Sequence, residues 1–144
     1  MVAFANKPPS SAAPPEPPHG FPVPGPEFSP EQVVQFQVYA LQHNEDPQHD
    51  AGIAAAFEFA SPANREATGP LTRFISLVHN GQYAALLNAI SAEYGPTCID
   101  GESAIQPVLI TTRTGDRVGY VFVLSRQADG PFEGCWMTDA VIPQ

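Results

Sequence analysis

Apolar residues in the first half of the chain recur at the spacing of an α-helix. Val34, Val38 and Leu41 lie at i, i+4 and i+7, which places them on one face. Ser29-Pro30 precedes this stripe and supplies an N-cap residue followed by a proline at the first helical position. The Gln two positions later can close a capping box. We therefore predict a first helix from this cap to about His43.

A second, short helix is predicted after a polar turn. Asp50 can cap its first turn, and its apolar residues continue to Ala60. Pro62 is expected to end it, because the residue before a proline is disfavoured in the α conformation. Residues 61–66 are then expected to form a polar loop, in which Asn64 and Arg65 hydrogen-bond across the fold as structural residues.

A third helix is predicted to end at His79, whose side chain we expect to cap the last carbonyls. Thr68-Gly69-Pro70 can cap and start this helix, and Asn80-Gly81 supplies a left-handed residue after it. Its apolar residues lie at i, i+3, i+4 and i+7 and therefore form one face of a helix: Leu71, Phe74, Ile75 and Val78.

From about residue 91 the pattern changes to β-branched and aromatic residues between closely spaced turns. Ile105 to Thr112, Arg117 to Arg126 and Cys135 to Ile142 are predicted to be three antiparallel strands. The middle one is apolar on both faces, which indicates a central strand. For residues 83–89 and 93–99 the pattern allows either a short strand or a short helix. Helices followed by strands indicate the α+β class, with helices packed on one face of an antiparallel sheet.

Prolines divide the chain into an arm and a domain. Ten of the seventeen prolines fall in residues 1–30, so we expect an extended arm over residues 1–28 and one domain over 29–144. Phe21, Val23 and Phe28 lie between these prolines and are candidates for docking into the groove of a partner. The alternative is a disordered leader.

Charge and composition exclude several classes of protein. Six Lys and Arg against fifteen Asp and Glu give a net charge of −9, which argues against a basic nucleic-acid interface. No apolar run reaches the roughly 18 residues of a membrane span. Cys98 and Cys135 lack the spacing of a zinc knuckle or redox pair, so we expect a soluble protein in a reducing compartment, cytoplasmic or organellar.

Three segments resemble a known family. They read FEFASPANR at residues 57–65, TGPLTRF at 68–74 and GCWMTD at 134–139. In this order they resemble domain-of-unknown-function family 4864 over about residues 30–143. The resemblance implies a fold like that of nuclear transport factor 2, the SnoaL-type cyclases and the cystatins, in which helices wrap a curved sheet into an open cone. No activity is agreed for the family, so it implies no catalytic residue. The motif residues that we expect to be structural are Ser61, Asn64, Arg65, Thr68, Gly69 and Pro70.

Asp139 is the candidate for an acid or base inside such a cone. It lies in an otherwise apolar strand, where desolvation would raise the pKa of its carboxyl group toward values suited to proton transfer. Strand alternation places it on the side of Val141, opposite Thr138. Three further side chains are candidates to line the same pocket: Tyr94, Tyr120 and His79. The alternative is a carboxylate at the rim that pairs with Arg113, Arg117 or Arg126.

Other catalytic and metal-binding patterns are weak. Five residues with metal-ligating groups fall between positions 43 and 50, namely His43, Glu45, Asp46, His49 and Asp50. Because they occupy a solvated turn around a proline, we expect no metal site there and no cofactor. The chain has no nucleophile-elbow motif, no Cys-His motif and no glycine-rich phosphate loop.

These observations favour a non-catalytic interaction module or accessory subunit. Its Pro-rich arm and exposed sheet face would bind a protein partner or a second copy of the chain, and Trp136 is expected to anchor the core or an interface. The alternative function is a small-molecule-binding protein, or a proton-transfer enzyme of isomerase or dehydratase type, that uses Asp139 with Tyr94 or Tyr120 in the cone.

Overall fold

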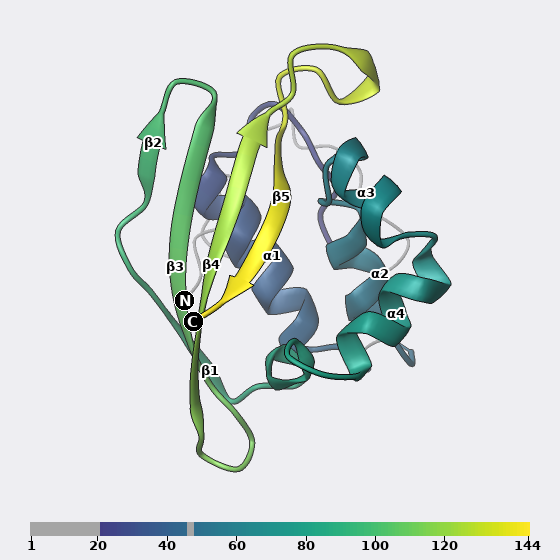
Figure 1. Cartoon of the computed structure of the whole chain (residues 1–144), viewed down its shortest axis with the longest axis vertical. Coiled ribbons are helices and arrows are strands. Elements are labelled where there is room, and N and C mark those ends of the chain that lie inside the picture. Colours follow the sequence, from purple (N-terminus) through teal and green to yellow (C-terminus); the bar gives the residue numbers. More distant parts are fainter. Residues whose placement is uncertain (1–20, 46–47) are drawn as a thin grey trace.

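The computed structural model describes residues 21–45 and 48–144, and within them helices precede a single antiparallel sheet (Figure 1). The predicted α+β class is confirmed. The first 20 residues of the expected Pro-rich arm lie outside the described part. The elements, in chain order, are α1 (Pro30–Gln42), α2 (Ala51–Phe57), α3 (Pro62–Thr68), α4 (Leu71–His79), the 3-10 turn η2 (Ala84–Leu86), β1 (Ser91–Tyr94), β2 (Cys98–Asp100), β3 (Ser103–Thr111), β4 (Arg117–Arg126), the 3-10 turn η3 (Gly130–Phe132) and β5 (Trp136–Pro143).

The sheet is open, with the strand order β1-β3-β4-β5, and β2 also pairs with β3. The central position predicted for β4 is therefore confirmed. Helix α1 crosses one face of the sheet, and the other helices gather beside it toward the β5 edge (Figure 1). No helix in the described residues is long and apolar enough to cross a membrane.

The core lies between the helices and the sheet face that they cover. The predicted stripe of α1 supplies Val34 and Val38, which are fully buried. Ile53 of α2 and Phe122 of β4 belong to the same cluster. Because the alternate residues of β4 point to the opposite face, the sheet keeps a second face that these helices do not cover.

The Ser-Pro dipeptide begins a helix at two places. At Ser29 the predicted capping box is complete: the Gln32 amide donates to Ser29 Oγ at 3.1 Å, and Gln32 Oε1 accepts from the Ser29 amide at 3.0 Å. The side chain of Ser61 likewise caps α3, with the Asn64 amide 3.3 Å from its Oγ. The expectation of a loop over residues 61–66 was wrong, because proline after a capping serine is suited to a first helical position.

The ends of the next helices also differ from the expectations. Helix α2 stops at Phe57 rather than Ala60. Thr68 belongs to α3, where its hydroxyl donates to the Asn64 carbonyl at 2.8 Å, so it does not cap the following helix. Helix α4 begins at Leu71, after a cis Gly69-Pro70 bond, and no side chain caps it.

Thr138 of β5 joins the helices to the edge of the sheet. Its amide donates to the Phe59 carbonyl at 2.8 Å, and its carbonyl accepts from the Ser61 amide at 2.9 Å and from Asn64 Nδ2 at 3.0 Å. Its hydroxyl donates to Oε1 of Gln37 in α1 at 2.5 Å, and Gln37 Nε2 donates to an α2 carbonyl at 3.1 Å. The backbone and side-chain groups of this one buried residue therefore hold three helical segments against β5.

A β-bulge at Asp139 changes the alternation of β5. Leu124 pairs with Thr138 and Val123 pairs with Ala140, so Asp139 is the extra residue. Thr138 and Val141 both pair with inward-facing residues of β4 although they are three residues apart. The expectation that they lie on opposite faces was wrong, because simple alternation does not hold across a bulge.

Gly52 sets the distance between α1 and α2. A Cβ atom at this position would lie 1.9 Å from the carbonyl oxygen of Ala40. We expect Gly52→Ala to lower the free energy of unfolding by about 1–3 kcal/mol, because the helices must separate. Chemical denaturation measures this, and Ala54→Gly calibrates helix propensity in the same helix. A gain of about 1 kcal/mol, as for a helical glycine with free space, would contradict the close contact.

The Thr138 hydroxyl is expected to contribute to the free energy of unfolding through its hydrogen bond to Gln37. Thr138→Val keeps the shape but leaves Gln37 Oε1 buried without its donor, since Nε2 is held by the α2 carbonyl. We expect a loss of about 1–3 kcal/mol in the free energy of unfolding. In the double variant Gln37→Met/Thr138→Val the unpaired oxygen is removed, and part of the loss is expected to be recovered. Equal stability of Thr138→Val and the wild type would refute this role.

Candidate functional site

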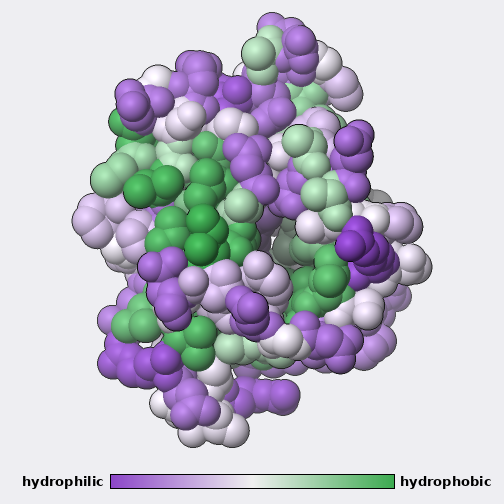
Figure 2. All heavy atoms as spheres, viewed as in Figure 1, coloured by the Kyte–Doolittle hydropathy of each residue, from purple (hydrophilic) through white to green (hydrophobic). Residues whose placement is uncertain are grey.

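A cavity of about 330 Å³ lies between the helices and the strands β4 and β5. This volume is near the lower end of the range of roughly 300–1,000 Å³ that small-molecule sites occupy. Ala67 of α3 and Leu77 of α4 line it and are exposed, so the cavity opens between these two helices. Figure 2 shows an apolar area over α4 beside a recess in the surface. Most of the lining is apolar: Leu41, Ala56, Ala67, Phe74, Leu77, Val78, Leu86, Phe122, Ala140 and Val141.

The uncharged polar side chains of the lining already make hydrogen bonds within the chain. Gln37 and Asn64 donate to carbonyls of α2 and β5, as described above. Thr68 donates to the Asn64 carbonyl, and the Tyr83 hydroxyl donates to the Val141 carbonyl at 2.9 Å. Each of these groups donates a hydrogen bond to a protein acceptor and the rest of the lining is mostly apolar, so the cavity is suited to an apolar molecule more than to a polar one.

Asp139 lines the cavity, but its carboxylate has a partner in the sheet. Oδ1 accepts a hydrogen bond from the Ser125 hydroxyl at 3.1 Å. Ser125 follows the inward-facing Leu124 in β4 and therefore points to the outer face, so the carboxylate is drawn toward that face. Two of the expected arginine partners are engaged elsewhere, Arg117 with Glu93 and Arg126 with Glu102.

Tyr94 and Tyr120 do not meet Asp139 in this cavity. Both line another hollow, together with Pro107. The Tyr120 hydroxyl donates to the Gln82 carbonyl at 2.6 Å. Burial raises the pKa of Tyr94 to about 12, so its phenol stays protonated at neutral pH. The structure therefore does not bring together the acid and the donors that the sequence suggested.

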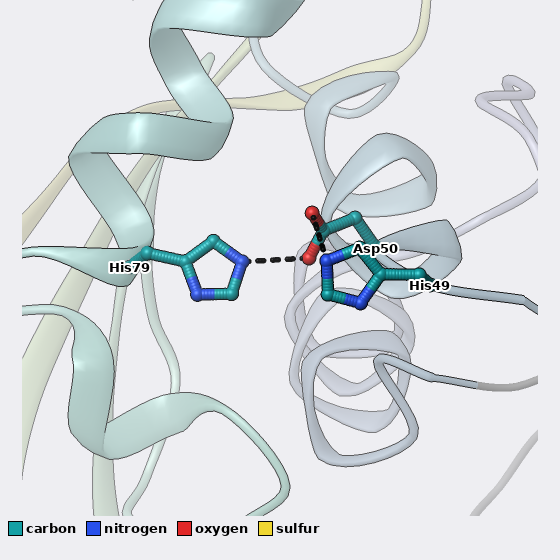
Figure 3. Close-up of side chains that lie close together, drawn as sticks. All are labelled: His49, Asp50 and His79. Carbon is teal, nitrogen blue, oxygen red and sulfur yellow. Dashed lines mark hydrogen bonds and ion pairs between the residues drawn. The ribbon is translucent and has the colours of Figure 1, made fainter.

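His79 lies against Asp50 instead of lining the cavity or capping its own helix. Its Nε2 is 2.7 Å from Asp50 Oδ1, and His49 Nε2 is 3.2 Å from Asp50 Oδ2 (Figure 3). The two imidazole rings are nearly parallel, with centroids 6.1 Å apart. We call His49, Asp50 and His79 the His-Asp-His cluster. It joins the turn before α2 to the last residue of α4, and sequence spacing gives no signal for a contact between residues 29 positions apart.

Hydrogen bonds from neighbouring polar groups hold the side chains of the cluster in position. The buried Asn44 accepts a hydrogen bond from the Ile53 amide at 2.8 Å and donates to Asp50 at 2.9 Å and to Glu45 at 3.0 Å. Burial opposes ionisation of Asp50, but hydrogen bonds from Asn44 and His79 outweigh it and lower the pKa of its carboxyl group. The hydrogen bond to Glu45 and the charge of Asp50 raise the pKa of His49.

The aromatic residues proposed for docking are largely covered by the chain itself. Phe21 is buried in a small cluster with three alanines of α1 and α2, and Phe28 packs edge-on against Phe36 with ring centroids 4.8 Å apart. Trp136 is buried in the main core. Val23 alone of the three candidates in residues 21–28 is exposed. The side chains of Phe21, Phe28 and Trp136 are buried within the chain and are not exposed for docking to a partner.

Backbone carbonyl groups hold the side chain of Arg65. Its guanidinium donates to the Glu58 carbonyl at 2.6 Å and to the Ala60 carbonyl at 3.0 Å. Its charged carbon lies 5.5 Å and 5.1 Å from the ring centroids of Phe57 and Phe132. These contacts fix the junction between α2 and α3, beside the point where it pairs with β5.

Two of the three motif segments, residues 57–65 and 134–139, meet in space, because Ser61 and Asn64 bind Thr138. No curated protein and no solved structure matches the chain. A family model described as domain of unknown function (DUF4864) matches residues 28–143, which is most of the chain. The chain belongs to the DUF4864 family.

Proposed function

We propose that this domain is a non-catalytic binding protein that takes a small apolar molecule into the cavity between α3, α4 and the sheet. The observation behind this proposal is the cavity itself: it measures about 330 Å³, its lining is mostly apolar, and each uncharged polar side chain of the lining already donates a hydrogen bond within the chain. A proton-transfer reaction would need the Asp139 carboxylate and a tyrosine hydroxyl to converge, whereas Asp139 hydrogen-bonds to Ser125 and the hydroxyl of Tyr83, which lines the same cavity, donates to the Val141 carbonyl. We therefore prefer binding to catalysis.

The cone-like architecture of nuclear transport factor 2 is part of the same proposal. It is supported by the order of helices before sheet, by the helices on one face of the sheet, and by a hollow between the two layers. Proteins of such a fold serve many purposes, so the proposed function depends on the cavity and not on the fold.

Blocking the mouth of the cavity tests this function. Ala67→Trp places an indole at an exposed position that lines the cavity, whereas Ala63→Trp places it at an exposed position of the same helix away from the lining. With N-phenyl-1-naphthylamine as an uncharged fluorescent probe, we expect saturable binding to the wild type and to Ala63→Trp. Ala67→Trp should bind at least about tenfold more weakly, because the ring occupies the entrance.

Two outcomes would contradict the proposal. One is the absence of saturable probe binding to the wild type, and the other is equal affinity of both tryptophan variants. Denaturation curves of the two variants should agree closely, since both substitutions are at the surface. Agreement ensures that a loss of binding reflects the blocked entrance and not partial unfolding.

A second proposal follows from the sheet face that the helices leave uncovered. Ile105 and Ile142 are 43% and 48% exposed there, and Val121 and Val123 pair beside them in β4. Figure 2 shows a broad apolar area over this part of the sheet. We define these four residues as the outer patch and propose that a second copy of the chain covers it, as a homodimer.

Light scattering after gel filtration tests the homodimer. We expect the wild type to elute at about twice the chain mass of 15.4 kDa. Ile105→Lys should be a monomer, because a charge would be buried in the interface. Ile99→Lys changes a still more exposed isoleucine that pairs with the inward-facing Ala104, and it should remain a dimer. A monomeric wild type, or a dimeric Ile105→Lys variant, would contradict this second proposal.

A further inference from the structure

We propose that the His-Asp-His cluster is a binding site for a divalent transition metal ion of the zinc class. Its three members offer two imidazole nitrogens and one carboxylate, and the ligating atoms all lie within 4.8 Å of one another. This donor set suits Zn²⁺, which binds histidine nitrogen and carboxylate oxygen in sites of three protein ligands and one open position. The proposal is independent of the ligand of the cavity.

The spacing of these atoms is close to that of a bound ion. Ligands about 2.0–2.1 Å from a tetrahedral zinc ion lie roughly 3.3 Å apart. His49 Nε2 and Asp50 Oδ2 are separated by 3.2 Å, and His79 Nε2 and Asp50 Oδ1 by 2.7 Å. An ion could therefore replace the two contacts of Asp50 that are drawn in Figure 3, with side-chain movements of a few tenths of an ångström to about 1 Å.

Glu45 and Asn44 provide the second observation in favour of a metal. Glu45 Oε1 lies 2.5 Å from Nδ1 of His49, which leaves Nε2 of the same ring directed at the cluster. A carboxylate that holds the other nitrogen of a ligating histidine is the usual arrangement around protein-bound zinc. Asn44, which is fully buried, holds both Glu45 and Asp50. The donors are therefore oriented by groups behind them, as in a built site.

The exposure of the cluster leaves room for exchange with solvent. The side chains of His49 and His79 are 74% and 36% exposed, whereas that of Asp50 is 14% exposed. Water can reach the fourth position, so the ion would be exchangeable. His79 directly follows Val78, which lines the cavity, so a bound ion would also fix the end of the helix that forms one cavity wall.

Without a metal the same contacts are hydrogen bonds or ion pairs between the two histidines and Asp50. Metal binding can be recognised by the release of protons. A ligating nitrogen must be unprotonated, so an ion that binds releases any proton that the nitrogen holds. Isothermal titration of Zn²⁺ into the untagged full chain near neutral pH distinguishes the two possibilities. We expect one ion per chain with a dissociation constant on the order of micromolar, and a heat that depends on the ionisation enthalpy of the buffer.

The variants have a matched control. His49→Ala and His79→Ala should each weaken Zn²⁺ binding at least about tenfold, and Glu45→Gln about 10–100-fold through loss of the support to His49. His43→Ala should bind as the wild type, because its Nδ1 contacts the Tyr39 carbonyl at 2.9 Å, outside the cluster. Zn²⁺ should raise the melting temperature of the wild type and of His43→Ala, but not that of His79→Ala.

Several results would overturn the metal site. They are the absence of binding to the wild type, an equal loss in His43→Ala and His79→Ala, and undiminished binding in the double variant His49→Ala/His79→Ala. The last result would place the ion on other residues of the chain. Since both histidines are at least partly exposed, circular dichroism should show the same helix content in all variants.

Discussion

Thr138 determines how the helices attach to the sheet. It lies at the edge strand, where an unpaired backbone would otherwise face the helical layer, and both its amide and its carbonyl bind the segment between α2 and α3. Its hydroxyl binds Gln37, which in turn binds α2. A buried polar group without a partner is costly, so these bonds permit one placement of α1 and α3 relative to β5. The cavity lies beside these bonds, since Gln37 and Asn64, which both bind Thr138, are part of its lining.

Helix α4 links the cavity and the His-Asp-His cluster. One side of it supplies Phe74, Leu77 and Val78 to the cavity, and its last residue, His79, belongs to the His-Asp-His cluster. The helix lacks a side-chain cap at its start, so its tertiary contacts and the contact of His79 with Asp50 hold it in place. A ligand in the cavity and an ion in the cluster would therefore both act on this helix, and each would favour its docked position.

Local patterns in the sequence predicted the elements better than the contacts between them. The stripe of α1, the central strand β4 and the α+β order follow from periodicity, which depends only on neighbouring residues. Ser61-Pro62 begins helix α3, as Ser29-Pro30 begins helix α1. The prediction that Ser61-Pro62 only ends the preceding helix was wrong, although the two dipeptides have the same sequence. The bulge at Asp139 brings Thr138 and Val141 to the same face although alternation predicted opposite faces, because the pairing with β4 creates the bulge. The approach of His79 to Asp50 depends on the packing of α2 against α4, which no spacing rule contains.

Xenon tests most directly whether an apolar cavity lies between α3, α4 and the sheet. A dry apolar cavity binds xenon, whereas a collapsed or water-filled one does not. In a crystal of the full chain under xenon pressure, we expect xenon density between α3, α4 and β5, in contact with Phe74 and Val141. Absence of xenon there, with the side chains of Phe74 and Leu77 closed over β5, would contradict the account.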